Sequence, residues 1–436
     1  AAVLAQRYGV SLSTLRQALE LLRSFGFSGG QLKGRHGTPE ENLTALADSL
    51  RQTAAEKDAA LLENELVWLL AEPAADADWE WVKPGLVSWD WWNGMRLTGV
   101  DFRAGRNTES YRYYIDFAAR YGIPYIIMDE GWSASTTDVF HPNPDLDLQE
   151  LIAYGRERNV QIVLWLTWLA VEKDMDRLFA TLEEWGIPGV KIDFMDRSDQ
   201  WMVGYYERVM KCAARHRLFV DMHGSYTPKG LYRTYPNLLT YEGVLGMEQG
   251  ARCKPENSNW LPFIRNAVGP MDFTPGSMFS AQPEDNRSTG ANPMGTGTRA
   301  YQMALYVVFE SPLQMLADNP VLYRREHPCT EFLAAVPTTW DSLRVLHAAC
   351  GREVVVARRK GDKWYVGGIT NDRPYTTEIA LDFLPAGRTF TMTSFEDGVN
   401  ADLQATDYRK RVREVDASTV VKVEMVRNGG WAAVIE

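Results

Sequence analysis

The sequence predicts an α/β protein: a TIM (β/α)₈ barrel followed by an antiparallel β-sandwich and preceded by a short helical segment. Two observations carry this prediction. From about residue 84, short apolar runs alternate with longer helical runs, which indicates a parallel sheet with crossover helices. After about residue 343 the helical period gives way to alternation of polar and apolar residues. We therefore expect a helical segment over 1–78, a barrel over 79–342 and a sandwich over 343–436.

Residues 4–19 have apolar positions at helical spacing around Gly9, and they resemble the helix-turn-helix of bacterial transcription regulators. The alternative is two short amphipathic helices. A DNA-reading helix needs a basic face, and only Arg7, Arg16 and Arg23 are available here. The alternative is therefore the favoured interpretation.

A leucine-rich stripe occupies residues 61–70. Its spacing predicts one helix over residues 55–72 that packs on the segment after it.

The barrel prediction rests on six strong strand candidates separated by helical runs. The expected strands are Leu86–Trp92, Tyr125–Asp129, Gln161–Trp168, Gly189–Phe194, Leu218–His223 and Leu238–Glu242. The expected helices are Thr108–Tyr121, Leu148–Arg158, Glu172–Trp185, Gln200–His216 and a turn near Lys229–Arg233. Strands this apolar are typical of a sheet that is buried on both faces.

Two weaker candidates complete the eight strands. Met271–Thr274 and Pro312–Leu316 are expected as strands seven and eight, with Thr298–Phe309 as the helix between them. The alternative architecture is a doubly wound sheet, but no Gly-rich phosphate-binding turn follows any of the strands. The C-terminal sandwich is expected from Glu353–Arg358, Lys363–Gly368, Thr377–Phe383, Thr389–Glu396 and Val420–Val426.

Composition narrows the classes of function. The chain has 436 residues, with 46 Lys and Arg against 57 Asp and Glu, for a formal net charge of −11. Such a chain without a basic cluster is a poor candidate for binding nucleic acid or a membrane surface. No apolar run reaches the roughly 20 residues of a membrane span. The four cysteines are scattered and indicate neither a zinc site nor a disulfide framework.

Acidic residues follow five of the six strong strands, at the end where barrel enzymes carry out their chemistry. They are Asp90, Asp129 with Glu130, Asp193, Asp221, and Glu242 with Glu248 on the loop beyond. Helix capping explains one such residue better than it explains five. Paired carboxylates suit glycoside hydrolysis, in which one group attacks the sugar or activates water and the other protonates the leaving oxygen. Converging carboxylates also suit a hard cation such as Ca²⁺.

Three other functions compete with this hypothesis. A metal-dependent isomerase or an aldolase on the same barrel would need a Schiff-base lysine or a metal cage, and Lys191 is the one well-placed lysine. A carbohydrate-binding barrel without catalysis is the second alternative. The third is a sugar-responsive regulator led by residues 1–27, which the lack of a basic face disfavours.

Several motifs together resemble glycoside hydrolase family 97. They are Trp81-Val82-Lys83-Pro84-Gly85, Ser88-Trp89-Asp90-Trp91-Trp92, Asp129-Glu130-Gly131-Trp132, Lys191-Ile192-Asp193-Phe194-Met195-Asp196-Arg197, Asp221-Met222-His223-Gly224, Tyr241-Glu242-Gly243 and Met247-Glu248-Gln249. Two later segments fit as well: Gly269–Gly276 and Ala304–Pro312. The resemblance runs from about residue 55 to the end of the chain.

The resemblance implies specific roles. Retaining members carry an Asp nucleophile at the position of Asp193, whereas inverting members place a Glu base at the position of Gly224. This chain therefore resembles the retaining α-galactosidases, with Glu248 as the acid/base and Ca²⁺ held by Glu242 and Glu248. The implied activity is exo-acting hydrolysis of an α-linked oligosaccharide or glycoside. An α-glucosidase, or a catalytically impaired sugar-binding barrel, is the alternative.

The resemblance also implies features outside the barrel. Family members carry a large N-terminal β-sandwich that contributes a Ca²⁺ ligand, and residues 1–50 do not resemble it. We therefore expect a truncated or rearranged chain. The sequence begins with Ala1 and shows no signal peptide; a periplasmic or secreted bacterial enzyme is expected from the family.

Other residues at the strand ends are candidates for binding the sugar. They are Trp89, Asp90, Glu130, Trp132, Trp168, Lys191 and His223. Lys191 shares a strand face with Asp193, so it either keeps that carboxylate ionised or binds a sugar hydroxyl. His223 either contacts the sugar or makes a structural hydrogen bond at the barrel rim. Each tryptophan is either a sugar platform or part of the core.

Overall fold

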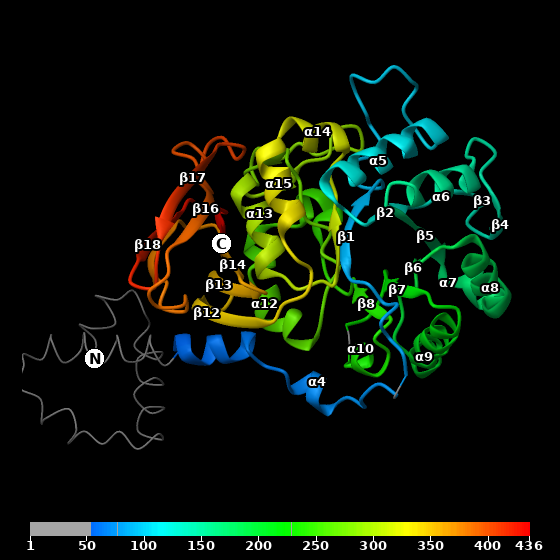
Figure 1. The fold of residues 1–436 in the computed structure, drawn as a ribbon, viewed down its shortest axis with the longest axis horizontal. Helices are drawn as coiled ribbons and strands as arrows, with labels where there is room; N and C mark the ends of the chain where they lie inside the picture. The colour runs from blue at the N-terminus through cyan, green and yellow to red at the C-terminus, as the bar shows by residue number, and fades with distance from the viewer. Residues whose placement is uncertain (1–53, 76, 228) are drawn as a thin grey trace, which may run out of the picture. The chain divides into compact units, whose positions relative to one another are not determined.

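The structure is a computed structural model that describes residues 54–75, 77–227 and 229–436. Residues 58–436 form one compact unit, drawn as a ribbon in Figure 1. The prediction for residues 4–19, and most of the predicted helical segment 1–78, lie outside the described residues.

The single helix predicted over residues 55–72 is wrong. Residues 54–62 are helical, and after a break a second helix, α4, spans Leu66–Leu70. Asn64 lies at the break, where its Oδ1 accepts a hydrogen bond from the backbone N–H of Leu66 at 2.9 Å. Asn side chains interrupt helices in this way because they offer the backbone an alternative partner. None of the five side chains of α4 is fully buried. The helix still packs on a later part of the chain, as predicted: the ring centroids of Trp68 and Tyr232 lie 5.3 Å apart, and Arg233 donates to the carbonyl oxygens of Trp68 and Leu69.

A parallel barrel sheet forms the core of the unit, as the sequence predicts. Its strands are β1 (Gly85–Trp89), β2 (Tyr125–Met128), β5 (Gln161–Thr167), β6 (Gly189–Asp193), β7 (Phe219–Met222), β8 (Leu238–Tyr241) and β11 (Leu313–Leu316). They lie in the order β11-β1-β2-β5-β6-β7-β8, and every neighbouring pair is parallel. The six strong strand predictions are therefore confirmed as strands, each shortened at its carboxyl end.

Helices follow the strands along the chain and pack outside the sheet (Figure 1). They are α5 (Thr108–Tyr121), α6 (Leu148–Arg156), α7 (Trp168–Lys173), α8 (Met175–Trp185), α9 (Gln200–Arg215), α10 (Leu231–Thr234) and α13 (Arg299–Val308). Their boundaries have local causes. Asn107 caps the first turn of α5 by accepting from Ser110 N, and Gly122 ends that helix in the left-handed conformation. Asp199 caps α9 in the same manner.

The barrel closes irregularly between β8 and β11. Residues 271–274, predicted as strand seven, do not form a regular strand. They still bridge the gap, because Asp272 N donates to Tyr241 O at 2.6 Å and Met271 N donates to Glu310 O at 2.9 Å. Pro270 and Pro275 flank the segment and cannot donate to a ladder, which explains the missing strand. Asp272 is nonetheless held in the barrel wall.

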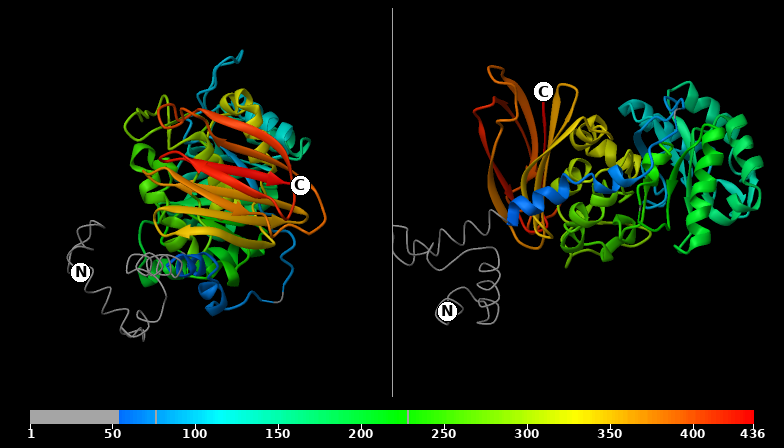
Figure 2. Two further views of the ribbon diagram at one scale, coloured as in Figure 1. Left: turned by 90° about the vertical axis from the view of Figure 1, so that its left-hand side faces the viewer. Right: turned by 90° about the horizontal axis from the view of Figure 1, so that it is seen from below.

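The C-terminal part is antiparallel. A six-stranded sheet has the order β12-β13-β14-β19-β16-β17, and a two-stranded pair joins β15 to β18; Figure 2 shows the large sheet nearly face on in its left panel. The strands are β12 (Ser342–Ala349), β13 (Glu353–Lys360), β14 (Lys363–Thr370), β15 (Tyr375–Ala380), β16 (Phe390–Asp397), β17 (Tyr408–Val415), β18 (Val420–Met425) and β19 (Gly430–Ile435).

The predicted sandwich has two unequal layers. A separate apolar cluster that includes Val366, Ile379 and Val423 fills the space between the large sheet and the β15–β18 pair. Helix α13 of the barrel packs on the large sheet, where β14 and β19 carry glycines at the contact. A Cβ at Gly430 would lie 2.3 Å from Tyr301 Cα, so this close approach of helix and strand requires glycine.

The remaining elements are short connections. They are the hairpin β3 (Ser133–Ser135) and β4 (Asp138–Pro142), η2 (Met247–Arg252), α11 (Pro255–Ser258), α12 (Leu261–Ile264), η3 (Asn266–Val268), β9 (Ser280–Ala281), β10 (Gly295–Thr296), α14 (Pro320–Arg325) and α15 (His327–Ala335). Among the described helices, none has both the length and the apolar character that a membrane crossing requires.

Candidate active site

Asp193 is the last residue of β6, at the carboxyl end of the barrel, and its side chain is buried. Two hydrogen bonds orient the carboxylate. The backbone N–H of Phe194 donates to Oδ1 at 2.7 Å, and the indole N–H of Trp165 donates to Oδ2 at 3.0 Å. Trp165 lies on the neighbouring strand β5, so two adjacent strands fix this carboxylate in one position. Such preorganisation is what an attacking group needs.

Gly224 lies directly beside Asp193. Its φ of +53° is a backbone conformation that favours glycine. A Cβ at this position would lie 2.9 Å from Phe194 N and 3.1 Å from Asp193 Oδ1. The Gly224 N–H donates to Glu242 Oε2 at 2.8 Å. In this structure, a side chain at position 224 and the observed position of Asp193 therefore exclude each other.

Gly224→Ala should lower the rate of any reaction that Asp193 carries out by roughly 100-fold, because the added methyl group displaces Asp193 and a misplacement of about 1 Å has effects of this size. Gly122→Ala is the matched control. Gly122 also has a positive φ, of +67°, but a Cβ there meets nothing within 4 Å. Steady-state kinetics of both variants, with thermal unfolding in parallel, separate the two effects. Equal activity loss in the two variants would show that backbone strain alone is responsible.

His223 lies at the centre of the acidic cluster and is buried. Its Nδ1 lies 3.7 Å from Asp193 Oδ2, 3.7 Å from Glu242 Oε2 and 3.9 Å from Glu248 Oε2. Burial and the nearby charge of Lys191 lower the pKa of His223, but Asp272 and Glu242 outweigh them and raise it to about 10. Without a metal ion beside it, the surrounding carboxylates therefore favour the protonated imidazole; a bound cation would favour the neutral ring instead.

Asp193 and Glu248 approach each other through this histidine. Because one oxygen of each lies within 4 Å of His223 Nδ1, those two oxygens are less than about 8 Å apart. Glu248 is in η2, and its backbone N–H donates to Thr274 Oγ1 at 3.1 Å. Burial raises the pKa of Glu248, while Lys191 and His223 act in the opposite direction. A raised pKa is typical of a carboxyl group that donates a proton.

Lys191 is buried and bound to Asp129. Its Nζ donates to Asp129 Oδ2 at 2.9 Å, and Trp89 Nε1 donates to the same oxygen at 2.8 Å. Burial alone would lower the pKa of Lys191, but the carboxylates of Asp129 and Glu248 raise it above its usual value. A Schiff-base lysine needs a lowered pKa, so these contacts disfavour the aldolase hypothesis.

The other predicted sugar-binding residues do not all lie beside Asp193. Asp90 is buried behind Asp129: it accepts from Tyr111 Oη at 2.6 Å and from Asp129 N at 3.2 Å. Burial, followed by the charge of Asp129, raises its pKa to about 7. Glu130 follows β2, and its backbone N–H donates to Asp129 Oδ1.

The three candidate tryptophan platforms pack against protein. Trp89 and Trp132 are completely buried, and Trp132 Nε1 donates to Trp165 O at 2.7 Å. Trp168 packs edge-on against Trp201 and Tyr205. These rings form part of the core around the site in this structure.

Sequence reasoning missed Trp165 as a partner of Asp193 and Asp272 as a partner of His223. Asp272 Oδ2 lies 3.3 Å from His223 Nε2, although the pair is not aligned as a regular hydrogen bond. Asp221 is buried without a hydrogen-bond partner for either carboxylate oxygen, and burial and the charge of Asp272 raise its pKa. The signal for Asp272 was weak, because its segment lacks the alternation of a strand.

Glu242 and Glu248 fit part of a Ca²⁺ shell. With His223 they offer one ligand atom each, and these three atoms lie within 4.8 Å of one another. Ca²⁺ takes six to eight oxygen ligands, and the two glutamates supply oxygens of the right kind. Water or further oxygen ligands would complete the shell.

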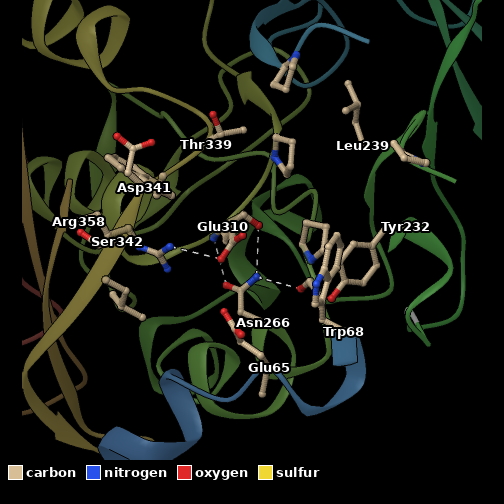
Figure 3. A pocket seen from close by; sticks show the side chains of 18 of the residues that line it. Glu65, Trp68, Tyr232, Leu239, Asn266, Glu310, Thr339, Asp341, Ser342 and Arg358 are labelled. Carbon is tan, nitrogen blue, oxygen red and sulfur yellow. Dashed lines mark hydrogen bonds and ion pairs between the residues drawn. The ribbon is translucent and has the colours of Figure 1, made fainter. Parts of the chain in front are cut away.

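A hollow away from these residues is lined by side chains that Figure 3 shows. It has a volume of about 820 Å³, and Trp68, Tyr232 and Glu310 are among the residues that line it. Pro84 and Pro312, which precede β1 and β11, also line it, so it opens at the amino ends of the strands. None of the predicted site residues lines this hollow. Barrel enzymes react at the carboxyl ends, so the cluster around Asp193 is the better candidate for the active site.

Two family descriptions match the chain. Glycoside hydrolase 97 matches residues 89–244, and Glycosyl-hydrolase 97 C-terminal, oligomerisation, matches residues 339–436. A retaining alpha-galactosidase of Bacteroides thetaiotaomicron is 42% identical over 390 residues, which are 88% of this chain and 58% of that protein. The chain belongs to glycoside hydrolase family 97. The family resemblance and the barrel fold inferred from the sequence are thereby confirmed.

A second curated relative and a solved structure are also similar to this chain. A probable retaining alpha-galactosidase of Streptomyces bingchenggensis is 33% identical over 409 residues, which are 92% of this chain and 60% of that protein. A family 97 enzyme of Pseudoalteromonas sp. strain K8, solved in complex with acarbose, has a TM-score of 0.78 and 30% identity. The alignment covers 87% of this family 97 chain and 64% of that structure. The chain thus spans about three fifths of the length of the curated relatives that it matches.

Proposed function

We propose that the chain is a retaining, exo-acting α-galactosidase, with Asp193 as the nucleophile and Glu248 as the acid/base. The observation that carries this proposal is the pairing of Asp193 with Gly224. The carboxylate is fixed by two donors, and the neighbouring position has no room for the Glu base that an inverting member would carry. Similarity to two proteins named as retaining alpha-galactosidases supports the choice of galactose.

The proposed reaction is a double displacement. Glu248 protonates the glycosidic oxygen while Asp193 attacks the anomeric carbon, so the bond to the leaving group breaks as a β-linked glycosyl-enzyme forms. Glu248 then removes a proton from water, which attacks the anomeric carbon and releases Asp193. The sugar leaves with its α-configuration. Lys191 and His223 are proposed to bind the sugar, since both lie within the buried cluster around Asp193.

Glu242 would hold a bound Ca²⁺, and Glu248 would join it in the ionised form that remains after its proton is given up. The ion would add positive charge that stabilises the developing negative charge on the substrate oxygen. We therefore expect EDTA to lower kcat for an aryl α-galactoside by at least about 10-fold and added Ca²⁺ to restore it. The measurement is steady-state kinetics across a panel of aryl α-glycosides, with chelator and with Ca²⁺. Activity on α-glucosides in place of α-galactosides would overturn the sugar assignment. Rates unchanged by the chelator would remove the metal from the proposal.

The substrate expected for this site is a neutral α-linked glycoside or oligosaccharide. A periplasmic or secreted bacterial location is part of the proposal, and cell fractionation tests it.

A further inference from the structure

Phe194 combines two unfavourable features directly after the nucleophile. Its side chain is 51% exposed, and its φ is +69°. A bulky residue with positive φ is a backbone outlier, and an exposed phenylalanine leaves a large apolar surface in water. Its neighbours in sequence, Asp193 and Met195, are both buried. Outliers of this kind persist where function requires them.

The contacts of Phe194 link its ring to the site. Its backbone N–H holds Asp193 Oδ1, and its ring meets the ring of Trp165 edge to face, with 5.6 Å between ring centroids. Trp165 in turn donates to Asp193 Oδ2. One indole ring therefore separates the exposed phenyl ring from the nucleophile.

The other aromatic residues at the strand ends have less exposed ring surface on which a ligand could stack. Trp89, Trp132 and Trp165 are buried, so they have no ring face open to a ligand that extends into solvent. Trp91 is 36% exposed, but the guanidinium of Arg106 lies 5.5 Å from its ring centroid.

We propose that Phe194 is the aromatic platform for the leaving-group part of the substrate, on which an aryl or sugar ring stacks while Asp193 attacks. This inference rests on the proposed function, because it takes Asp193 as the nucleophile. In this proposal the reacting sugar lies against the buried groups around Asp193, and the leaving group extends toward solvent. An exposed ring one residue from Asp193 meets that second part. Aromatic and sugar rings both pack well on a phenyl face.

Two substrates that differ only in the leaving group test the proposal. The leaving group of 4-nitrophenyl α-galactoside is an aromatic ring that can stack on Phe194, whereas the leaving group of α-galactosyl fluoride is a single fluoride ion. Phe194→Gly removes the ring and suits the positive φ, so the backbone is not strained further. The specificity ratio, kcat/KM for the aryl substrate over kcat/KM for the fluoride, should fall by roughly 10-fold in Phe194→Gly. Phe194→Tyr keeps the ring face and should keep the ratio of the unmodified protein.

The outcomes separate this proposal from the function on which it rests. If the unmodified protein turns over neither substrate, the proposed function fails. If both substrates lose activity equally in Phe194→Gly, the ring acts only by supporting Trp165 and Asp193, and the platform is overturned. An unchanged ratio at full activity also overturns it. Thermal unfolding of both variants confirms that the rates are those of folded protein.

Discussion

Asp193→Ala should lower turnover of an aryl α-galactoside by roughly 10⁴-fold or more, the size of effect seen when a catalytic nucleophile is removed. The loss follows from chemistry, because without the carboxylate no glycosyl-enzyme can form. The protein should stay folded, since Asp193 lies at a strand end and its two donors, Trp165 and Phe194, keep their other contacts. Steady-state kinetics and thermal unfolding provide the two measurements.

Azide should partly rescue the Asp193→Ala variant. The small anion fits the space left by the carboxylate and attacks the same face of the sugar, so the product should be β-galactosyl azide. Asp196→Ala is the matched control, because Asp196 is an exposed carboxylate three residues beyond Asp193, in the loop that follows β6. It should keep nearly full activity without azide. An unchanged rate in Asp193→Ala would remove this residue from the mechanism.

Glu248→Ala should lower kcat/KM by roughly 10²- to 10⁴-fold for substrates with poor leaving groups, which need a proton to depart. A dinitrophenyl leaving group departs with little need of a proton. For the dinitrophenyl galactoside, the rate of glycosyl-enzyme formation should therefore fall much less in Glu248→Ala. Burial raises the pKa of Glu248, which is consistent with a group that holds a proton before the reaction. Kinetics with a series of aryl α-galactosides of graded leaving-group pKa measure the difference.

Azide distinguishes the roles of the two carboxylates. In Glu248→Ala it should intercept the glycosyl-enzyme on Asp193 and give α-galactosyl azide, the opposite anomer to that from Asp193→Ala. Glu256→Ala is the control, since Glu256 is an exposed residue on the adjacent helix α11. Equal losses for good and poor leaving groups would contradict the acid role of Glu248.

The barrel strands could be predicted because each one is a short run of apolar residues that is visible in the sequence itself. Runs such as Gly189–Asp193 are apolar along their length, as strands buried on both faces must be. The sequence wrongly predicts a strand at residues 271–274. The irregular backbone there could not be foreseen, because the pairing of Asp272 with Tyr241 depends on how β8 and β11 come together. The charged edge strand β17 was also missed: six of its eight residues are exposed or only partly buried polar and charged residues, so it lacks a clear apolar face.

The position of Asp193 in the acidic cluster could be predicted, because the active sites of barrel enzymes lie at the carboxyl ends of the strands. Its partners did not follow, because they are set by three-dimensional packing. Trp132 and Trp165 are both tryptophans near the carboxyl ends of strands and both are buried, yet only Trp165 bonds to Asp193. Only the burial of an aromatic ring distinguishes a sugar platform from a core side chain, and burial is not visible in the sequence. The roles of Trp89 and Trp132 therefore stayed undecided, and Phe194 was not considered as a platform.

The anomer of galactose that is released first tests the central claim most directly. Proton NMR during the first turnovers of an aryl α-galactoside, before mutarotation, reports that configuration. Attack by Asp193 followed by attack of water predicts that α-galactose appears first and the β-anomer grows in later. Initial release of β-galactose would show single displacement by water and would contradict Asp193 as the nucleophile.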